Sequence, residues 1–312
     1  IRVIKPVFDF IQTVPGYREF DISMWFLLFF SVFFAMLIGD AGYGLIYLGV
    51  TVFAQAKLRK KVKSKEPFIL LYVLSICTVI WGALTGNWFG VEAISQVSPF
   101  KDMIVPSLNA YSSISQNTVI HICFVIGAVQ LTIGHLMAAF RYINSVKAIE
   151  QIGWVFVIWS AYFLACMFVL KQPIPSYFTY LLGTGVGLVL FTIFADRQKR
   201  KHAPIEIWDL FMSSISAFAD TMSYIRLFAV GLATLAVAQS FNSMAMTIGF
   251  GGVVSGFFAS LILFLGHALN IVLALMAVVV HGVRLNMLEF SGHVGNTWSG
   301  YDYSPFEKKA VD

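Results

Sequence analysis

Two arginines lie inside long apolar stretches of this sequence, where charged side chains are rare. Arg226 lies about 19 residues from either end of the stretch 207–245, and Arg284 lies in the stretch 257–290. An arginine at the centre of a membrane helix costs about 2.5–3.5 kcal/mol, and its guanidinium stays protonated, so it can hold an anion but cannot relay a proton. Each arginine is therefore a candidate functional charge. The alternative is a structural ion pair inside a helix bundle.

Polar side chains accompany both arginines and form candidate ion paths on either side of them. On a regular helix, Asn270, His281 and Arg284 fall within about 60° of one another and would make a polar stripe. Two alternatives stay open: a histidine satisfied in the core and, for Asp209, a charge at a helix N-terminus. The candidate path residues are Asp209, Asp220 and Ser223 before Arg226, Gln239 after it, His267, Asn270 and His281 before Arg284, and Glu289 after it.

Small side chains share the helix face of Arg226. A face of this kind has two interpretations. It permits close packing of a neighbouring helix, or it offers a smooth surface past which another helix moves. The residues on this face are Ala219, Met222, Ser223, Ala229, Val230 and Ala233.

Composition identifies the kind of chain that must position these residues. The sequence is 58% hydrophobic and only 12% charged, with a mean hydropathy of +0.80. Soluble domains carry about twice that charged fraction, so a polytopic membrane protein is expected. The net charge of +5 does not indicate nucleic acid, because the basic residues lie in short clusters between apolar stretches. The three cysteines lie within apolar runs without metal-ligand spacing, and we expect no cofactor and no metal.

We predict an all-α fold with about eight membrane spans, of which the last two are too long to cross upright and must tilt. The expected spans are 21–38, 41–56, 67–85, 117–140, 151–170, 177–195, 207–245 and 257–290. The predicted organisation is a cytoplasmic lead-in helix (1–20), a six-helix membrane bundle (21–206), two long tilted helices (207–290) and a cytoplasmic tail (291–312).

The basic residues predict the orientation. Seventeen of the 21 Lys and Arg residues lie in segments that fall on one side of the predicted spans. The other side has only Lys101 and Lys171. Because positive residues collect on the cytoplasmic side, both termini are expected in the cytoplasm.

A glycine-rich segment separates the first two spans. Gly39, Gly42 and Gly44 surround Asp40. Such a segment forms either a tight turn, with Asp40 as the cap of the second helix, or a broken helix with Asp40 on an ion path.

Four motifs carry a family resemblance. They stand in the order Ile38-Gly-Asp-Ala-Gly-Tyr-Gly, Ser223-Tyr-Ile-Arg-Leu-Phe-Ala, His281-Gly-Val-Arg-Leu-Asn-Met-Leu-Glu-Phe and Tyr301-Asp-Tyr-Ser-Pro-Phe. They resemble motifs of the membrane domain of V-type ATPase subunit a, called subunit I in the prokaryotic V/A type. The second and third resemble the family's Ser-Tyr-Leu-Arg-Leu-Trp-Ala and His-x-x-Arg-Leu-His-Trp-x-Glu motifs.

The resemblance implies a stator subunit whose last two helices lie against a rotating ring of c (K or L) proteolipid subunits. Arg226 and Arg284 match the two family arginines, which would separate two cation half-channels in a rotary ATPase or ATP synthase. The resemblance also implies three further partners: peripheral stalk subunits, a central stalk-ring subunit and the surrounding lipid. The peripheral stalk subunits would be held through an upstream cytoplasmic domain. A prokaryotic plasma membrane is the expected location.

The chain departs from the eukaryotic pattern at three positions. Thr234 and Ala274 stand where eukaryotic members carry His and Glu, and Phe228 replaces Trp. These differences resemble the prokaryotic type and leave the lining of the external half-channel open. The sequence begins at Ile1, and we expect it to be the membrane part of a longer chain.

Two other functions compete with this interpretation. One is a secondary ion transporter, which usually shows matching broken helices in two halves. The other is a scaffold that packs against the ring without conducting. We expect this chain to have no nucleotide-hydrolysing site, because it lacks a Gly-x-x-x-x-Gly-Lys loop. We favour protons as the transported ion, with sodium as the alternative.

Overall fold

The computed structural model describes residues 2–14, 16, 19–58, 65–196, 200–296 and 298–300. These residues form helices and loops without a strand, so the predicted all-α class is confirmed. The Tyr301 motif lies outside the described residues. The helices are η1 (Arg2–Ile4), α1 (Lys5–Ile11), α2 (Ser23–Ile38), α3 (Ala41–Leu58), α4 (Glu66–Thr85), α5 (Glu92–Ser95), α6 (Phe100–Met103), η2 (Pro106–Leu108), α7 (Ser113–Arg141), α8 (Lys147–Leu170), α9 (Phe178–Ala195), α11 (Ala203–Ser223), α12 (Ile225–Ile248), α13 (Val253–Ala277), η3 (Val278–Gly282), η4 (Leu285–Phe290) and α14 (Ser291–Val294).

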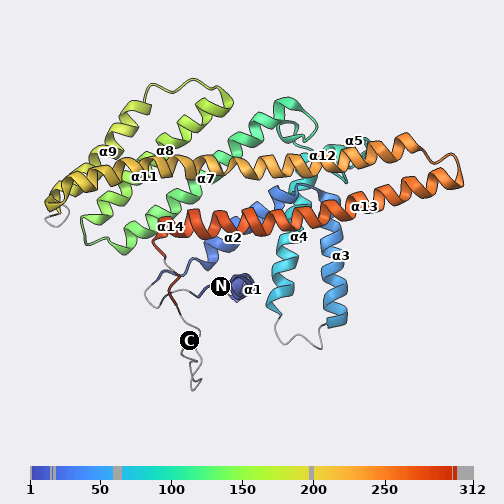
Figure 1. Cartoon of the computed structure of the whole chain (residues 1–312), viewed down its shortest axis with the longest axis horizontal. Coiled ribbons are helices and arrows are strands. Elements are labelled where there is room, and N and C mark those ends of the chain that lie inside the picture. Colours follow the sequence, from blue (N-terminus) through green and yellow to red (C-terminus); the bar gives the residue numbers. More distant parts are fainter. Residues whose placement is uncertain are drawn as a thin grey trace, which may run out of the picture.

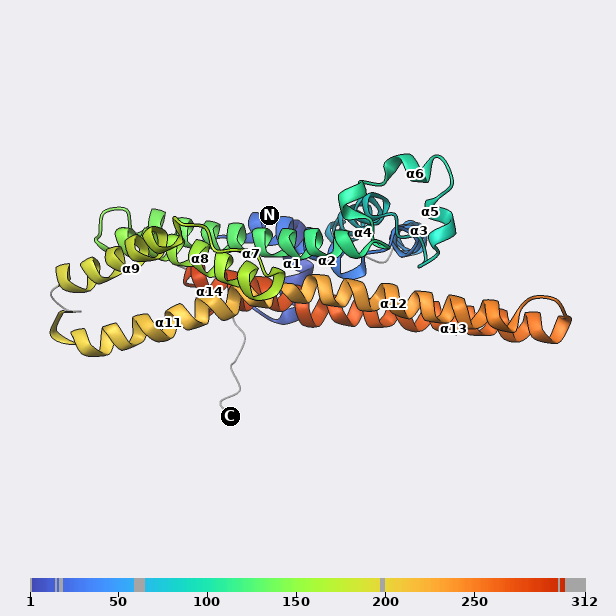
Figure 2. The same ribbon diagram turned by 90° about the horizontal axis from the view of Figure 1, so that it is seen from above.

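The helices form two layers. In Figure 1, α11 and α12 run across the view as one long rod above α13 and α14, while α3 and α4 run down the view. Figure 2 shows the same rods as a separate layer beside α2–α4 and α7–α9. The contacts agree, because α12 packs on α13 and α2, and α11 packs on α8 and α9. The two layers therefore meet along α2, α7 and α8.

Phenylalanines on α2 form the core between these layers. Phe26, Phe29, Phe30, Phe33 and Phe34 are all buried, and consecutive rings along the helix lie about one turn apart in contact. Each large aromatic ring buries 150–250 Å² in general, so such a helix makes a rigid floor for what packs on it.

Neither long rod is a regular α-helix. Tyr224 interrupts the first rod between α11 and α12, just before Arg226. In the second rod, two π-helical segments, η3 and η4, flank Arg284. π-Helical turns are rare and frequently mark functional sites. Both irregularities fall beside the two arginines that the sequence singled out.

Six helical segments among the described residues are long and apolar enough to cross a membrane, which confirms a polytopic membrane protein. Two of them, Ala203–Ile248 with 46 residues and Val253–Val294 with 42, are the long pair that the sequence predicted. Helix α2 is apolar but shorter, and α3 is not among the six. The number eight and the tilt remain predictions.

Candidate functional site: two arginines on one carboxylate

Arg226 and Arg284 converge on a single buried carboxylate. Arg226 Nη2 donates to Glu289 Oε1 at 3.2 Å, and Arg284 Nε lies 3.8 Å from the same oxygen. Ser223 Oγ points to that oxygen as well, at 3.4 Å. In the described part of the chain no other carboxylate is within ion-pair distance of either arginine. Two permanent positive charges therefore share one negative charge.

The two arginines differ in exposure. The Arg226 side chain is 26% exposed, and its Nε also donates to Ser223 O at 3.0 Å. The Arg284 side chain is 54% exposed, whereas Glu289 is only 5% exposed. The structural ion pair named above as an alternative thus exists for both arginines, but the Arg284 side chain remains about half exposed to a neighbour.

The π-helix explains how Arg284 reaches Glu289. On an α-helix, residues five apart are about 140° apart around the axis and cannot meet. A π-helical turn pairs residue i with i+5, which places them on one side. Because η4 begins directly after Arg284 and contains Glu289, the pair becomes an intrahelical contact. The same distortion breaks the expected stripe, since Asn270 is fully buried while Arg284 is exposed.

A buried hydrogen-bond network fixes the two rods to each other. Tyr224 OH donates to Gln130 Oε1 at 2.9 Å, and Gln130 Nε2 donates to Asn286 Oδ1 at 2.9 Å. Asn286 Nδ2 in turn donates to Gly282 O at 3.1 Å. All three side chains are fully buried. Through Gln130, helix α7 therefore connects Tyr224, at the interruption before Arg226, to the π-helical segment η4, which carries Glu289.

A second polar cluster lies further along both rods. Tyr43 OH bonds His267 Nδ1 at 2.8 Å and accepts from Asn270 Nδ2 at 3.0 Å. Asn270 Nδ2 also donates to Thr234 O at 2.8 Å, and His267 Nε2 bonds Asn242 Oδ1 at 3.1 Å. This cluster joins α3, α12 and α13. His267 and Asn270 thus lie in one cluster, which is separate from the site formed by Arg226, Arg284 and Glu289.

Asp40 caps α3 and ties it to the loop after α4. Its Oδ1 accepts from the backbone N–H of Gly42 at 2.7 Å, Tyr43 at 3.2 Å and Phe89 at 3.0 Å. Its second oxygen is buried without a hydrogen-bond partner. Three backbone contacts to Oδ1 therefore support the turn-and-cap interpretation, and a role on an ion path remains a prediction.

The remaining candidates take different positions. His281 lies half-buried one turn before Arg284, and its Nδ1 is buried without a partner. Asp220 lies one turn before Ser223 and pairs with His293 Nε2 at 3.1 Å. Gln239 lies half-buried on α12, where its backbone faces Gly90. Asp209 is exposed about three turns before Asp220 on α11, away from the centre.

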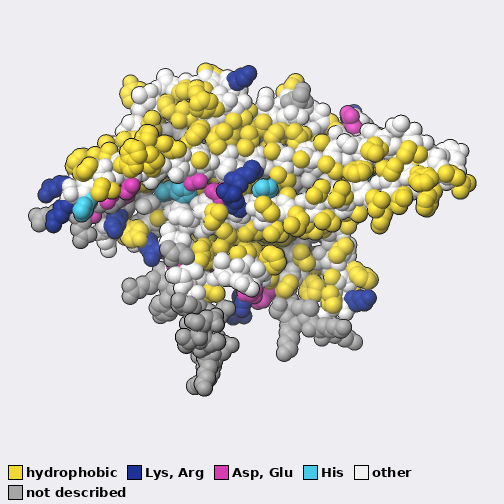
Figure 3. All heavy atoms as spheres, in the orientation of Figure 1, with side chains coloured by type: hydrophobic (Ala, Val, Ile, Leu, Met, Phe, Trp, Pro, Cys, Tyr) yellow, Lys and Arg dark blue, Asp and Glu magenta, His cyan; other side chains and the backbone are white. Residues whose placement is uncertain are grey.

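Small residues on the face of Arg226 are exposed. The side chains of Ala219, Ala229 and Ala233, on α11 and α12, are exposed and are not packed inside the protein. Figure 3 shows basic, acidic and histidine side chains gathered near the middle of this open face, with hydrophobic side chains to both sides. A narrow charged centre thus interrupts an apolar surface.

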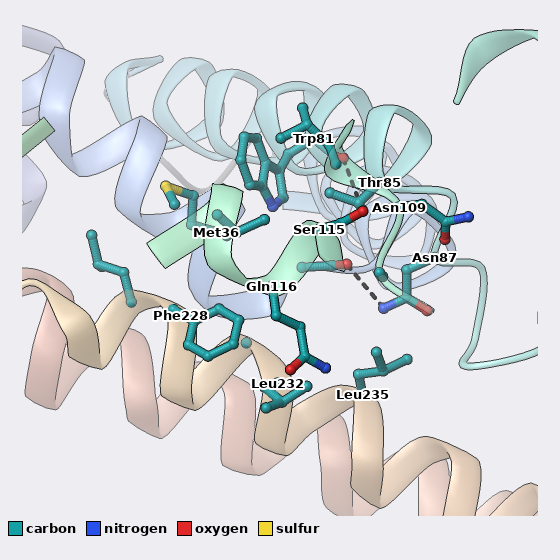
Figure 4. Close-up of a pocket in the computed structure, with 16 residues that line it drawn as sticks. Met36, Trp81, Thr85, Asn87, Asn109, Ser115, Gln116, Phe228, Leu232 and Leu235 are labelled. Carbon is teal, nitrogen blue, oxygen red and sulfur yellow. Dashed lines mark hydrogen bonds between the residues drawn. The ribbon is translucent and has the colours of Figure 1, made fainter. Parts of the chain in front are cut away.

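A pocket lies on the other flank of α12. It follows Arg226 along the helix and is walled by Phe228, Leu232 and Leu235 (Figure 4). Gln116 of α7 and Asn87, after α4, reach in from the opposite side, and Asn87 donates to Gly39 O at 2.9 Å. Polar groups therefore approach α12 at a level beyond Arg226.

Sequence reasoning missed several residues of these networks. Tyr224 and Asn286 stand inside the motifs that were quoted, but their partners could not be read from spacing. Gln130 and His135 are polar residues within the apolar stretch 117–140, which is a signal that could have found them. The missed residues include Tyr43, Gln130, Tyr224, Asn242, Asn286 and His293, together with His135, whose ring lies 4.8 Å from that of His293.

Fold and site together define a class. This is an all-α polytopic membrane protein with two long, interrupted helices and a pair of arginines at their crossing.

Comparison with known proteins finds relatives of this chain. The chain is 39% identical over 322 residues to V-type ATP synthase subunit I of Borreliella burgdorferi, covering 98% of this chain and 52% of that protein. It is 34% identical to V-type ATP synthase subunit I 1 of Treponema pallidum, covering 99% and 51%. It is 26% identical to A-type ATP synthase subunit I of Methanocaldococcus jannaschii, covering 98% and 48%. Models of protein families give no match.

Over nearly its whole length, the chain is therefore similar to about half of subunit I of V-type and A-type ATP synthases, which supports the resemblance that the motifs predicted. It spans about half the length of the curated relatives it matches.

Proposed function

We propose that this chain is the stator of the membrane sector of a V/A-type rotary ATPase or ATP synthase. Two cation half-channels meet it at the exposed face of α11–α14, and Arg226 and Arg284 stand between them. A ring of small proteolipid subunits turns against this face. ATP chemistry belongs to other subunits. The names of the relatives and the charge balance of the site support this assignment.

One observation carries the proposal: two guanidiniums share the single carboxylate of Glu289. These three side chains alone carry one more positive charge than negative, which is costly in hydrocarbon unless an anion lies nearby. Arg284 is open to such an anion. A mid-membrane carboxylate on each ring subunit would fit the surplus.

The mechanism follows from electrostatics. Against lipid, a ring carboxyl group must be neutral or occupied by an ion, because an unpaired buried charge is very costly. Beside Arg226 and Arg284 its ionised form is favoured, so the ring site gives up its ion there. After it passes the arginines, it reloads from the other half-channel. A direct leak is blocked, since a cation would have to pass two fixed positive charges.

The surroundings of the centre suit these roles. The exposed Ala219, Ala229 and Ala233 give a smooth track for a passing helix. Asp220 and Ser223 lead to the centre from one side, and the pocket beside Phe228 lies on the other. His267, His281 and Glu289 line or adjust the path, so single substitutions there should slow transport without stopping it.

The proposed setting is a prokaryotic plasma membrane with both termini in the cytoplasm. The distribution of Lys and Arg supports this orientation. Peripheral stalk subunits would be held by the part of the relatives' length that this chain does not span.

A cross-linking experiment tests the stator role. Ala233→Cys is combined with a cysteine beside the mid-helix carboxylate of the proteolipid subunit that copurifies from native membranes. Oxidation should give a stator–ring cross-link that stops ATP-driven transport until it is reduced. Gly187→Cys, on exposed α9, serves as the control and should not cross-link. If no small subunit with a mid-helix carboxylate copurifies, the proposal is wrong.

A further inference from the structure

A series of titratable and polar side chains lies beside Arg226, Arg284 and Glu289, and apart from Asp220 it has no part in the proposal so far. Asp220 Oδ2 lies 3.1 Å from His293 Nε2. The His293 ring lies 4.8 Å from the His135 ring, centroid to centroid. His135 Nδ1 bonds Gln151 Oε1 at 2.7 Å. These residues come from α11, α14, α7 and α8, so the series crosses four packed helices.

On both long helices, this series of side chains lies one helical turn from the site of Arg226, Arg284 and Glu289. Asp220 stands three residues before Ser223, whose Oγ donates to Asp220 O at 2.7 Å and reaches Glu289 Oε1 at 3.4 Å. His293 stands four residues after Glu289. A proton on the Asp220–His293 pair is therefore one turn away from the carboxylate that both arginines contact.

Asp220 and His293 are partly exposed, and His135 is buried. The Asp220 side chain is 32% exposed and that of His293 is 18% exposed. His135 is 6% exposed, stacks on Trp154 and keeps its Nε2 buried without a hydrogen-bond partner. The bond to Gln151 and the stack on Trp154 fix the His135 ring against His293. His135 therefore positions His293 and does not itself face the path.

The two histidine rings cannot both carry a proton at low cost, because like charges a few ångströms apart repel strongly in a membrane interior. The groups that face His293 are the Asp220 carboxylate from α11 and the His135 imidazole from α7. Histidine is the side chain best suited to exchange protons near neutral pH, and the Asp220 carboxylate at 3.1 Å is placed to accept a proton from His293.

We propose that Asp220 and His293 are the proton-exchanging pair of the half-channel at the α14 end, and that His135 is their positioning residue. This inference rests on the proposed function, and it names the transported ion as the proton. A proton taken up at His293 Nδ1 gives the imidazolium. The Nε2 proton then passes to Asp220 Oδ2, which leaves a neutral imidazole and a neutral carboxylic acid. Asp220 next releases that proton toward the ring site and becomes a carboxylate again, and exchange of the Nδ1 proton for one on Nε2 returns His293 to its starting tautomer.

The test uses the assembled ATPase in sealed vesicles, with ATP-driven acidification as the readout. His293→Gln keeps a hydrogen-bond donor for Asp220 but cannot titrate in this range, and Asp220→Asn keeps the size of the side chain. Each should lower the proton transport rate by about tenfold or more, and flatten its dependence on pH between about pH 5 and 8, where histidine changes charge. The double variant should be no slower than the slower single variant, because both act in one step.

His121→Gln is the matched control. It lies on α7 like His135, but its ring bonds Tyr162 of α8 and is not part of this series. It should keep the wild-type pH profile. Asp220→Glu retains a carboxylate and should restore much of the rate, which a purely structural role would not predict.

The outcomes separate this inference from the function it rests on. If Arg226→Ala stops transport while His293→Gln and Asp220→Asn keep the wild-type rate and pH profile, the proton-exchanging pair is refuted and the stator role stands. If Arg226→Ala also transports normally, the stator role itself is refuted. Should His293→Gln fail to assemble, Asp220→Asn decides, since its side chain is partly exposed. A rate that depends on sodium and not on pH overturns the inference.

Discussion

Arg284 and Glu289 are five residues apart in the chain, and Arg284 Nε still lies 3.8 Å from Glu289 Oε1. The π-helical segment Leu285–Phe290 makes this possible, because it turns residue i+5 back to the side of residue i. Arg226 reaches the same oxygen from the other rod. The local backbone distortion therefore creates a centre with two positive charges and one negative charge.

Loss of the shared carboxylate should slow the motor. In Glu289→Gln, both arginines keep only the ring carboxylate as an anionic partner and hold it more tightly. If the arginines bind the ring carboxylate more tightly by about 1.4 kcal/mol, its release from them slows roughly tenfold. The rate of ATP-driven transport in vesicles should therefore fall about tenfold without reaching zero. Glu92→Gln, exposed on α5, is the charge-matched control, and an unchanged rate in Glu289→Gln would count against the shared centre.

A large side chain on the small exposed face should obstruct the ring. Ala233 is exposed on α12, and Leu in its place adds volume where a passing helix must come close. Overpacking costs about 1–3 kcal/mol, so Ala233→Leu should lose about tenfold or more in transport rate while membrane insertion is kept. Gly187→Leu on α9 adds a larger side chain in open space and should leave the rate unchanged. Equal rates for both variants would show that nothing moves past Ala233.

The hydrogen-bond network that joins the two long helices through Gln130 should depend on the Tyr224 hydroxyl. Tyr224→Phe removes the donor to Gln130 Oε1 and leaves that oxygen unpaired in a fully buried position. Such a loss costs about 1–3 kcal/mol. Thermal unfolding of the detergent-solubilised protein should show a lower midpoint and coupled transport should weaken. Tyr180→Phe, 78% exposed on α9, should change neither.

Close packing of α3 against α4 should make Gly82 intolerant of a side chain. A Cβ at Gly82 would lie 2.1 Å from the backbone nitrogen of Ala41, so Gly82→Ala must push the helices apart. The expected loss of stability is about 1–3 kcal/mol. Gly49→Ala on α3 meets no atom within 4 Å and should stabilise the helix by up to about 1 kcal/mol. Thermal unfolding of both variants checks this contrast, and similar midpoints would refute it.

The sequence predicted the class of fold and the central charges because both have strong local signals. Long apolar runs gave the helices, and arginines within such runs are rare enough to mark the site. The glycines around Asp40 also predicted the break between α2 and α3.

The partners of the arginines could not be predicted, because they depend on backbone distortion and on contacts far apart in sequence. Regular helix geometry puts Glu289 on a different side from Arg284, so only the π-helix reveals the pair. Tyr224 and Gln130 are 94 residues apart, and a buried amide has no feature that names its partner. His293 follows the last apolar stretch and carries no signal until α11 and α7 are placed beside it.

Coupled transport by Arg226→Ala tests the central claim most directly. The assembled complex is placed in sealed vesicles, and ATP hydrolysis and ion uptake are measured together, with Arg226→Lys and Arg284→Ala alongside. We predict that Arg226→Ala inserts and assembles but moves no ions in step with hydrolysis, that Arg284→Ala is impaired less completely, and that Lys is a poor substitute because it lacks the planar guanidinium. Ion uptake at the wild-type ratio to ATP hydrolysis in Arg226→Ala would contradict the role assigned to this arginine.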